Sequence, residues 1–343
     1  MAEFALGPPC GRGRIRAADE DFRVVEQLGY TPSGEGEHLW LEVEKRDWNT
    51  LDVARFLAEK AGVPLRHVGF AGLKDRHAVT RQPFTIHLAG RADPAWPEWQ
   101  APGIRIVSGL RHRRKIQRGR LAGNRFELVV RDFDGDRDRV GERLVQIERG
   151  GVPNRFGEQR FGGNNIARAH RMFRGELQRA PSRAKRGFYL SAARSLIFNH
   201  ILDERIRRAD WNHIIGGDVL NLDGSRSRFA AGDDPALAAR VEALDLHPTG
   251  PLFGVGDLET TGEAAALEQD WINRQRELAD GLLRFGTAMD RRPLRMRVGP
   301  VESSWRRDGS LELAFTLPAG SFATTVLAEI LEYQDASRDN TES

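Results

Sequence analysis

The chain has 343 residues, more than one ordinary core of roughly 100–200 residues, so two domains are expected. Its 40% hydrophobic and 29% charged residues are typical of globular proteins and exclude a wholly disordered or fibrous chain. The 52 basic and 49 acidic residues leave a net charge of only +3, which excludes a bulk polycation but allows a local basic patch.

The first 150 residues are expected to mix strands with a few helices. Alternating apolar residues predict a strand over 38–44, and apolar residues at helical spacing predict a helix from Asn49 or Thr50 to about Ala61. Further along, the pattern predicts strands over 84–88, 104–107 and 125–133, a turn over 131–137 and a helix over 139–149.

Beyond a Gly- and Pro-containing break at 150–154 the pattern becomes mostly helical. Helices are expected over 189–208 and 264–283, with loops and short strands over 216–234. The end of the chain predicts strands over 294–298 and 311–317 with Trp305 in their connection, a helix over 324–331 and a frayed tail over 333–343. Strands at both ends around a helical middle suggest one mixed domain interrupted by an insertion, with two consecutive domains as the alternative.

The basic residues are unusual in kind, because 47 of the 52 are Arg. The planar guanidinium group forms bidentate contacts with phosphate, so this bias suits a protein that binds RNA or DNA. Codon bias in a GC-rich genome gives the same excess without any nucleic acid, and composition alone does not separate the two explanations.

The densest basic segment lies between residues 111 and 120, where six of ten residues are Lys or Arg and none is acidic. Its cations are Arg111, Arg113, Arg114, Lys115, Arg118 and Arg120. Such a run is expected where a nucleic-acid backbone binds, although charge runs also occur on solvated faces. Two weaker strips contain Arg12, Arg14 and Arg16, and Arg183, Lys185 and Arg186.

The segment 69–82 carries the most distinctive chemistry, because Asp75 stands in it among Lys74, Arg76 and His77. A carboxylate in such surroundings can act as a nucleophile, a base or a metal ligand. The alternative is a solvated turn with surface ion pairs. Lys74 is adjacent to Asp75 but would point to the opposite face of an extended strand, so the cation that pairs with Asp75 stays open, with His77 and Arg81 as candidates.

Two further segments combine aromatic and polar residues. Asn124 and Phe126 directly follow the basic run; an Asn amide can read a base edge and a Phe ring can stack on a base, although Phe126 could equally be an ordinary core residue. The segment 154–163 holds two Phe, two Arg and several Gly, and either covers a bound strand or connects two domains.

Several chemistries are excluded by missing motifs. The sequence lacks the patterns of zinc proteases, EF-hands, P-loop NTPases and serine hydrolases, and the single Cys10 excludes an intrachain disulfide and a multi-cysteine zinc site. The first residues do not resemble a signal peptide, and no window approaches the roughly 20 apolar residues of a membrane helix. We therefore expect a soluble, cytoplasmic protein.

Taken together, these segments resemble the TruD family, the tRNA pseudouridine synthase D enzymes, along nearly the whole chain and in order. The block at 70–80 resembles the family signature around its catalytic aspartate. The other matching blocks lie at 20–26, 34–38, 49–50, 151–162, 190–195 and 318–324.

The resemblance implies an α+β fold: a pseudouridine-synthase mixed, largely antiparallel sheet with flanking helices, plus an inserted α/β TRUD domain. The catalytic domain would be discontinuous, over 1–150 and 299–343, and the inserted domain would cover 151–298.

The resemblance also implies site residues and a reaction. Asp75 would be the catalytic nucleophile, and Phe22, Asn124, Phe126 and Phe322 would contact the substrate. Phe126 would be the stacking aromatic, and it lacks the hydroxyl of the Tyr that other pseudouridine synthases usually have there. The reaction would convert uridine to pseudouridine at position 13 of tRNA with no cofactor and no metal, by a monomer that needs no protein partner and no membrane.

Two other classes of function remain as alternatives. A non-catalytic RNA-binding protein would share the basic and aromatic segments but would have no use for a carboxylate at Asp75 near phosphates. A metal-dependent RNA hydrolase would combine Asp75 with other acids, such as Asp132, Asp134 and Asp136, and would lose activity with a chelator.

Overall fold

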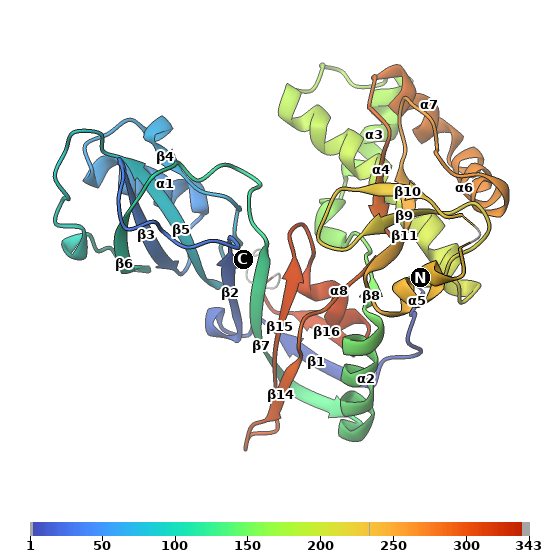
Figure 1. The fold of residues 1–343 in the computed structure, drawn as a ribbon, viewed down its shortest axis with the longest axis horizontal. Coiled ribbons are helices and arrows are strands. Elements are labelled where there is room, and N and C mark those ends of the chain that lie inside the picture. The colour runs from blue at the N-terminus through green and yellow to red at the C-terminus, as the bar shows by residue number, and fades with distance from the viewer. Residues whose placement is uncertain (1–2, 233, 338–343) are drawn as a thin grey trace. The chain divides into compact units, whose positions relative to one another are not determined.

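The computed structural model describes residues 3–232 and 234–337, which form two compact units. The sheet unit comprises residues 10–140, 298–320 and 331–337. The α/β unit comprises residues 3–9, 141–232, 234–297 and 321–330. Each unit is built from segments that are far apart in the sequence (Figure 1).

The sheet unit is organised around one ten-stranded sheet, in which the order β14-β15-β7-β2-β5-β3-β6 forms the main path. β1 pairs with β7 and β16, and β4 pairs with β5. The strands are β1 (Gly11–Ile15), β2 (Phe22–Gln27), β3 (His38–Lys45), β4 (Val68–Gly69), β5 (Val79–His87), β6 (Ile104–His112), β7 (Gly123–Gly135), β14 (Glu302–Trp305), β15 (Leu311–Pro318) and β16 (Glu332–Asp335). Among the described strands of this sheet, only the pairs β2–β5 and β1–β16 are parallel, which agrees with the expected mixed, largely antiparallel sheet.

The core of this unit follows from the alternation along β3. Leu39, Leu41 and Val43 are buried on one face of the sheet, where they pack against Val53 and Leu57 of helix α1 (Thr50–Lys60). The helix begins after Asn49 and ends before Gly62, as the sequence predicts.

Three predictions about the strands are wrong. Trp305 belongs to β14 rather than to a connection. Residues 333–335 are part of β16 rather than of a frayed tail. The last part of the expected tail, 338–343, lies outside the described residues. The expected turn over 131–137 is strand up to Gly135, because its acids are cross-strand partners of basic residues in β1: Arg12 pairs with Asp134 at 2.7 Å. The sequence pattern did not indicate these strands, because their polar side chains form ion pairs and do not give the alternating apolar pattern of a strand with a buried face.

The α/β unit contains a four-stranded sheet in the order β10-β9-β11-β12, with a two-stranded pair of β8 and β13. Its strands are β8 (Val152–Pro153), β9 (Val219–Leu222), β10 (Arg228–Ala230), β11 (Leu246–Leu252), β12 (Asp290–Pro293) and β13 (Arg295–Met296). Its helices are most of α2 (Arg137–Gly150), α3 (Asn165–Arg174), α4 (Arg183–Arg207), α5 (Ala236–Glu242), α6 (Gly262–Arg274), α7 (Arg276–Arg284) and α8 (Ala323–Ala328). The helix predicted over 264–283 is two helices, since the chain turns at Gln275.

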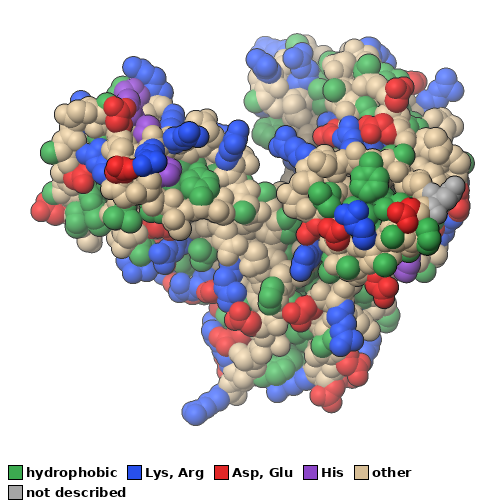
Figure 2. All heavy atoms as spheres, viewed as in Figure 1, with side chains coloured by type: hydrophobic (Ala, Val, Ile, Leu, Met, Phe, Trp, Pro, Cys, Tyr) green, Lys and Arg blue, Asp and Glu red, His purple; other side chains and the backbone are tan. Residues whose placement is uncertain are grey.

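Helix α4 forms the centre of the α/β unit. Its apolar side chains, including Ile197 and Ile201, pack with Phe173 of α3 and with Leu278 and Leu282 of α7. In the described residues, no helix is long and apolar enough to cross a membrane. Figure 2 shows basic and acidic side chains interspersed over the visible surface.

Candidate active site

Asp75 lies in the loop between β4 and β5, with 43% of its side chain exposed. Its carboxylate oxygen Oδ2 accepts a hydrogen bond from Nη2 of Arg16 at 2.9 Å. Arg81, a candidate partner from the sequence, instead pairs with Glu42 at 3.2 Å. Arg16 directly follows β1 and is 59 residues away from Asp75 in the chain.

Arg16 is held in place from three sides. Its second nitrogen, Nη1, donates to Oδ2 of Asp335 at 2.8 Å, and its guanidinium carbon lies 3.9 Å from the centre of the Phe22 ring. The backbone of Arg16 has a φ of +56°, a left-handed conformation that costs a non-glycine residue roughly 1–2 kcal/mol. Strain of this kind is concentrated at functional sites, where the surrounding structure enforces it.

Lys45 approaches Asp75 from the sheet. It is the last residue of β3 and only 1% exposed, and its Nζ donates to the backbone carbonyl of Asp75 at 2.6 Å. Burial lowers the pKa of Lys45 to about 8, and the nearby charge of Asp75 partly opposes this shift. Nothing in the local sequence indicated this residue, because a lysine that ends a strand usually projects into solvent.

The loop before Asp75 is anchored by a buried ion pair. Lys74 binds Glu26 of β2, and these side chains are only 6% and 0% exposed. Glu26 also accepts from the backbone nitrogen of Gly72 at 3.0 Å, and the carbonyl of Gly72 accepts from Gln82 Nε2 at 3.0 Å. Lys74 therefore fixes the loop, and Arg16 and Lys45 contact Asp75 itself.

Phe22 and Phe126 lie on neighbouring strands of the sheet, with ring centres 6.2 Å apart in an edge-to-face arrangement. They are 3% and 6% exposed, so most of each ring packs inside the protein. Because Arg16 stacks on Phe22 and binds Asp75, this aromatic pair is directly connected to the candidate nucleophile.

Asn124 lies next to this pair, opposite Glu26 in the register of β7 and β2. Cross-strand partners project from the same face of a sheet. The Oδ1 atom of Asn124, Oε1 of Glu26 and Oγ1 of Thr80 are buried and find no hydrogen-bond partner among residues 3–232 and 234–337. Buried polar atoms without partners are rare, and their concentration on one sheet face marks this region as a place where a polar ligand group fits.

Phe322, the remaining residue expected to contact substrate, belongs to the α/β unit. It is partly exposed and occupies the position just before helix α8. The structure thus gathers Asp75, Phe22, Asn124 and Phe126 in the sheet unit, while Phe322 lies in the other unit.

The cations of the basic segment 111–120 differ from one another in exposure and in whether an acidic residue neutralises them. Arg111 pairs with Asp93 at 2.5 Å, Arg113 pairs with Glu35, and Lys115 donates to the carbonyl of Arg66. The exposed cations of this segment are Arg113, Arg114, Arg118 and Arg120, and Arg118 lies 4.3 Å from the centre of the Phe70 ring.

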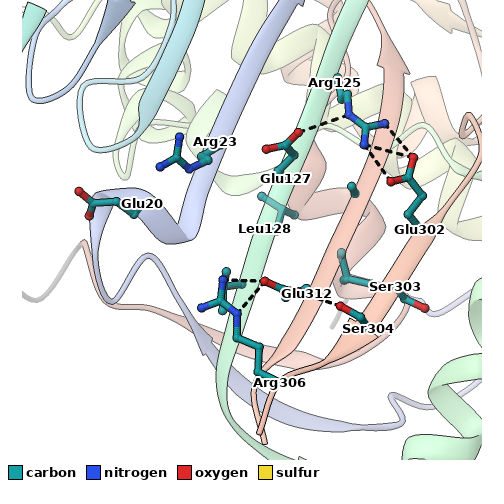
Figure 3. Close-up of a pocket in the computed structure, with 13 residues that line it drawn as sticks. Glu20, Arg23, Arg125, Glu127, Leu128, Glu302, Ser303, Ser304, Arg306 and Glu312 are labelled. Carbon is teal, nitrogen blue, oxygen red and sulfur yellow. Dashed lines mark hydrogen bonds and ion pairs between the residues drawn. The ribbon is translucent and has the colours of Figure 1, made fainter. Parts of the chain in front are cut away.

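A hollow of about 500 Å³ is lined by Arg23 of β2 and Arg125 of β7, among others (Figure 3). Because side chains alternate along a strand, these arginines face the opposite side of the sheet from Phe22 and Phe126. Figure 3 shows Arg125 directed at Glu302 and Arg306 directed at Glu312, at 3.0 and 2.6 Å. Acids accompany its arginines, so this hollow does not resemble a phosphate site. Across the described residues, no group of three or more His, Cys, Asp or Glu has a geometry that could hold a metal ion.

The amino-acid sequence is similar to one protein family and to its members along nearly the whole chain. The family model described as tRNA pseudouridine synthase D (TruD) matches residues 1–183 and 163–330. The tRNA pseudouridine synthase D of Hydrogenovibrio crunogenus is 43% identical over 331 residues, which cover 96% of this chain and 95% of that protein. The protein of the same name from Methylococcus capsulatus is 45% identical over 332 residues, covering 96% and 94%.

A solved structure from Methanosarcina mazei, described under the name TruD, is similar in fold. It aligns with a TM-score of 0.77 at 21% identity and covers 96% of each chain. This similarity confirms the fold class predicted from the sequence.

Proposed function

Because the chain belongs to the tRNA pseudouridine synthase D (TruD) family, as its sequence blocks suggested, we propose that it isomerises uridine to pseudouridine in tRNA. We further propose that the target is the uridine at position 13 and that Asp75 is the catalytic nucleophile. The observation that carries the proposal is the contact of an exposed aspartate with a strained, doubly bound arginine beside Phe22.

The proposed reaction needs no oxidant or reductant. The bond between ribose C1′ and uracil N1 breaks, the uracil turns, and C1′ becomes bonded to uracil C5. The hydrogen on C5 leaves as a proton and N1 gains a proton, so substrate and product are isomers. Asp75 can start this sequence by attacking the base, by attacking the ribose or by removing a ribose proton.

The groups around Asp75 have separate roles in this proposal. Arg16 fixes the direction of the carboxylate, because one guanidinium nitrogen binds Asp75 while the other is held by Asp335. Lys45 fixes the backbone of the same residue through its carbonyl. Preorganised charged and hydrogen-bonding groups of this kind lower the barrier without reorganising during the reaction.

The target uridine must leave its stack before Asp75 can reach it, at a cost of a few kcal/mol. Phe22, Phe126 and Phe322 are the proposed contacts for the flipped base, and stacking on one ring would return about 1–3 kcal/mol. Asn124 is proposed to read the polar edge of the uracil. This is supported by its Oδ1, which has no hydrogen-bond partner in the part of the chain that the structure describes. The cations Arg111, Arg113, Arg114, Lys115, Arg118 and Arg120 are proposed contacts for the RNA backbone.

The proposal also covers the domain organisation, the cellular location and the oligomeric state. Residues 151–298 would be the inserted TRUD domain, which is supported by the α/β unit that contains 151–232 and 234–297 together with shorter segments. The enzyme would act as a cytoplasmic monomer without a cofactor.

Chemical mapping of pseudouridine tests the proposed function. The purified protein is incubated with an unmodified tRNA transcript in a buffer containing a chelator, and the control transcript carries cytidine in place of the uridine at position 13. Pseudouridine is expected at position 13 of the first transcript only. Pseudouridine at another position would overturn the proposed site, and no pseudouridine in any tRNA of a complete set would overturn the activity.

A further inference from the structure

Three arginines of the α/β unit stand out because they are gathered without acidic partners. Arg160 ends the short 3-10 helix Glu158–Arg160, Arg194 lies on α4 and Arg292 lies on β12. None of the three forms an ion pair with a carboxylate in the described part of the chain.

A single aromatic ring brings two of these side chains together. The guanidinium carbons of Arg292 and Arg160 lie 4.3 and 5.3 Å from the centre of the Phe156 ring. Phe156 is itself fixed, because its backbone nitrogen and oxygen both bond to the side chain of Asn199, at 3.0 and 2.9 Å. The two cations therefore have a rigid support.

Neutral groups orient the guanidinium groups further. Arg160 Nε donates to the hydroxyl of Ser195 at 3.3 Å, and Arg292 Nε donates to the carbonyl of Asn154 at 3.2 Å. Arg194 donates to two backbone carbonyls, at 2.7 and 3.0 Å, while its Nε is buried and finds no partner among residues 3–232 and 234–337.

The electrostatic environment of the cluster is unfavourable for positive charge. Burial and, to a smaller extent, the charge of Arg160 lower the pKa of Arg292 to about 10. Burial also lowers the pKa of Arg160 and of Arg194. Asp290 favours the charged form of Arg194, but its carboxylate already binds Arg228 at 2.8 Å.

Two other arginines in the interior of this unit are neutralised by carboxylates. Arg205 pairs with Asp218 at 2.9 Å, and Arg291, the neighbour of Arg292 in the chain, pairs with Glu268 at 2.5 Å. Removing cations from water without a counter-charge costs free energy, so the protein ordinarily supplies one. Arg160, Arg194 and Arg292 differ from these two, because they have no carboxylate partner in the described residues and because the charge of Arg160 acts on both of the others.

We propose that Arg160, Arg194 and Arg292, with the hydroxyl of Ser195, form a binding site for a phosphate group of the RNA backbone. A phosphodiester offers oxygens that accept from several guanidinium groups at once, and guanidinium–phosphate bonds are among the strong hydrogen bonds in proteins. The inference rests on the proposed tRNA substrate, and it adds an RNA contact in the unit that does not contain Asp75.

Salt-dependent binding of tRNA tests this site in the full-length chain. Dissociation constants are measured between 50 and 200 mM salt in an Asp75→Asn background, so that turnover does not interfere. Arg160→Gln and Arg292→Gln are each expected to weaken binding about tenfold or more. Each is also expected to reduce the slope of log K against log salt by roughly 0.7–0.9, the value for one phosphate contact.

The matched control is Arg274→Gln. Arg274 also lies over an aromatic ring, 4.8 Å from the centre of Trp271, but it is exposed and pairs with Asp270 at 2.8 Å. Its loss should leave the affinity and the slope unchanged. Arg160→Lys keeps the charge, so it should keep the slope while losing part of the affinity.

The binding measurements distinguish a wrong phosphate site from a variant that does not fold and from a wrong proposed function. If Arg160→Gln binds tRNA with the slope of its parent, the phosphate site is wrong, whether or not affinity falls for structural reasons. If Arg292→Gln fails to fold, as melting in the absence of RNA would show, Arg160→Gln decides the question. If the parent itself does not bind tRNA, the proposed function fails rather than this site.

Discussion

Arg16 binds two carboxylates that come from distant parts of the chain, Asp75 and Asp335. One guanidinium group can satisfy both because its nitrogens project in fixed directions. The ammonium group of a lysine has no such fork, so the geometry of this contact depends on arginine specifically.

We predict that Arg16→Gln lowers kcat about 100-fold or more, because a charged contact to the reacting group is lost. Arg16→Lys should recover part of the rate, since the positive charge is kept while one of the two contacts is lost. Single-turnover measurement of pseudouridine formation checks both variants. A glutamine variant with the rate of the wild type would show that Arg16 has no part in the reaction.

Lys45 should affect activity more than stability. Lys45→Met removes the donor to the Asp75 carbonyl, so we predict a fall in kcat of about 10- to 100-fold through misplacement of the carboxylate. Folding should survive, because the lowered pKa shows that burial of this charge opposes stability at neutral pH. A large loss of thermal stability with unchanged kcat would contradict this role.

The pH dependence of stability gives a second test of Lys45. Its pKa is about 8 in the folded protein against 10.5 ordinarily, so between these values the unfolded chain binds more protons. Stability contributed by this residue therefore rises as pH increases from about 8 to 10.5, and Lys45→Met should lack that rise. The charges that influence Lys45 are those of Asp75, Lys74 and Asp19, and urea denaturation of both proteins over this pH range measures the difference.

At this scale the sequence proposed candidate site residues from local patterns but did not indicate the residues that contact them in the fold. Asp75 lies within the block at 70–80 and Asn124 directly follows the basic run, whereas Arg16 looked like one member of a basic strip. Its role depends on a pairing between residues 16 and 335 that no local pattern encodes. Lys45 was missed for the same reason.

At the scale of elements, the loop before Asp75 is stabilised by contacts with three neighbours. Glu26 of β2 binds Lys74, the hydroxyl of Thr50 at the start of α1 accepts from the Lys74 backbone nitrogen at 2.9 Å, and Gln82 of β5 binds the carbonyl of Gly72. A loop attached to a strand on either side and to a helix can hold a catalytic group without regular structure of its own.

We predict that Glu26→Gln destabilises the protein by about 3–5 kcal/mol, because it leaves the buried charge of Lys74 uncompensated. The matched control is Glu302→Gln, which removes an exposed partner of Arg125 and should not change stability measurably. Urea denaturation of the three proteins makes the comparison. Equal stability of the Glu26 variant and the wild type would show that this ion pair does not anchor the loop.

Elements with alternating or helical apolar patterns were predictable, and elements held by ion pairs were not. β3 and α1 appear where the sequence predicts them because their apolar side chains form the core. The end of β7 and the strand β16 have polar residues whose partners lie in β1, so only the folded sheet explains them. The break between α6 and α7 was also missed, since the apolar periodicity continues through Gln275.

At the scale of the whole molecule, the net charge says little about where RNA binds. Acids neutralise Arg111 and Arg113, while the exposed Arg114, Arg118 and Arg120 form no ion pair in the described residues. The distribution of unpaired arginines is therefore the better guide to RNA contacts.

We predict that replacing Arg114, Arg118 and Arg120 together with Gln reduces the salt slope of tRNA binding by up to about 2, at roughly 0.7 per phosphate. Replacing Arg111 and Arg113 should change the slope much less, because acids already neutralise them. Binding titrations at several salt concentrations check both variants. Equal slopes for the triple variant and the wild type would assign this segment to ordinary surface.

A single-turnover assay tests whether Asp75 performs the chemistry at the site made by Arg16 and Lys45. Asp75→Asn is assayed for pseudouridine formation in a single turnover with excess enzyme, alongside its affinity for the same tRNA. We predict that affinity is retained and that product is undetectable. Product formation by Asp75→Asn at the rate of the wild type would contradict it.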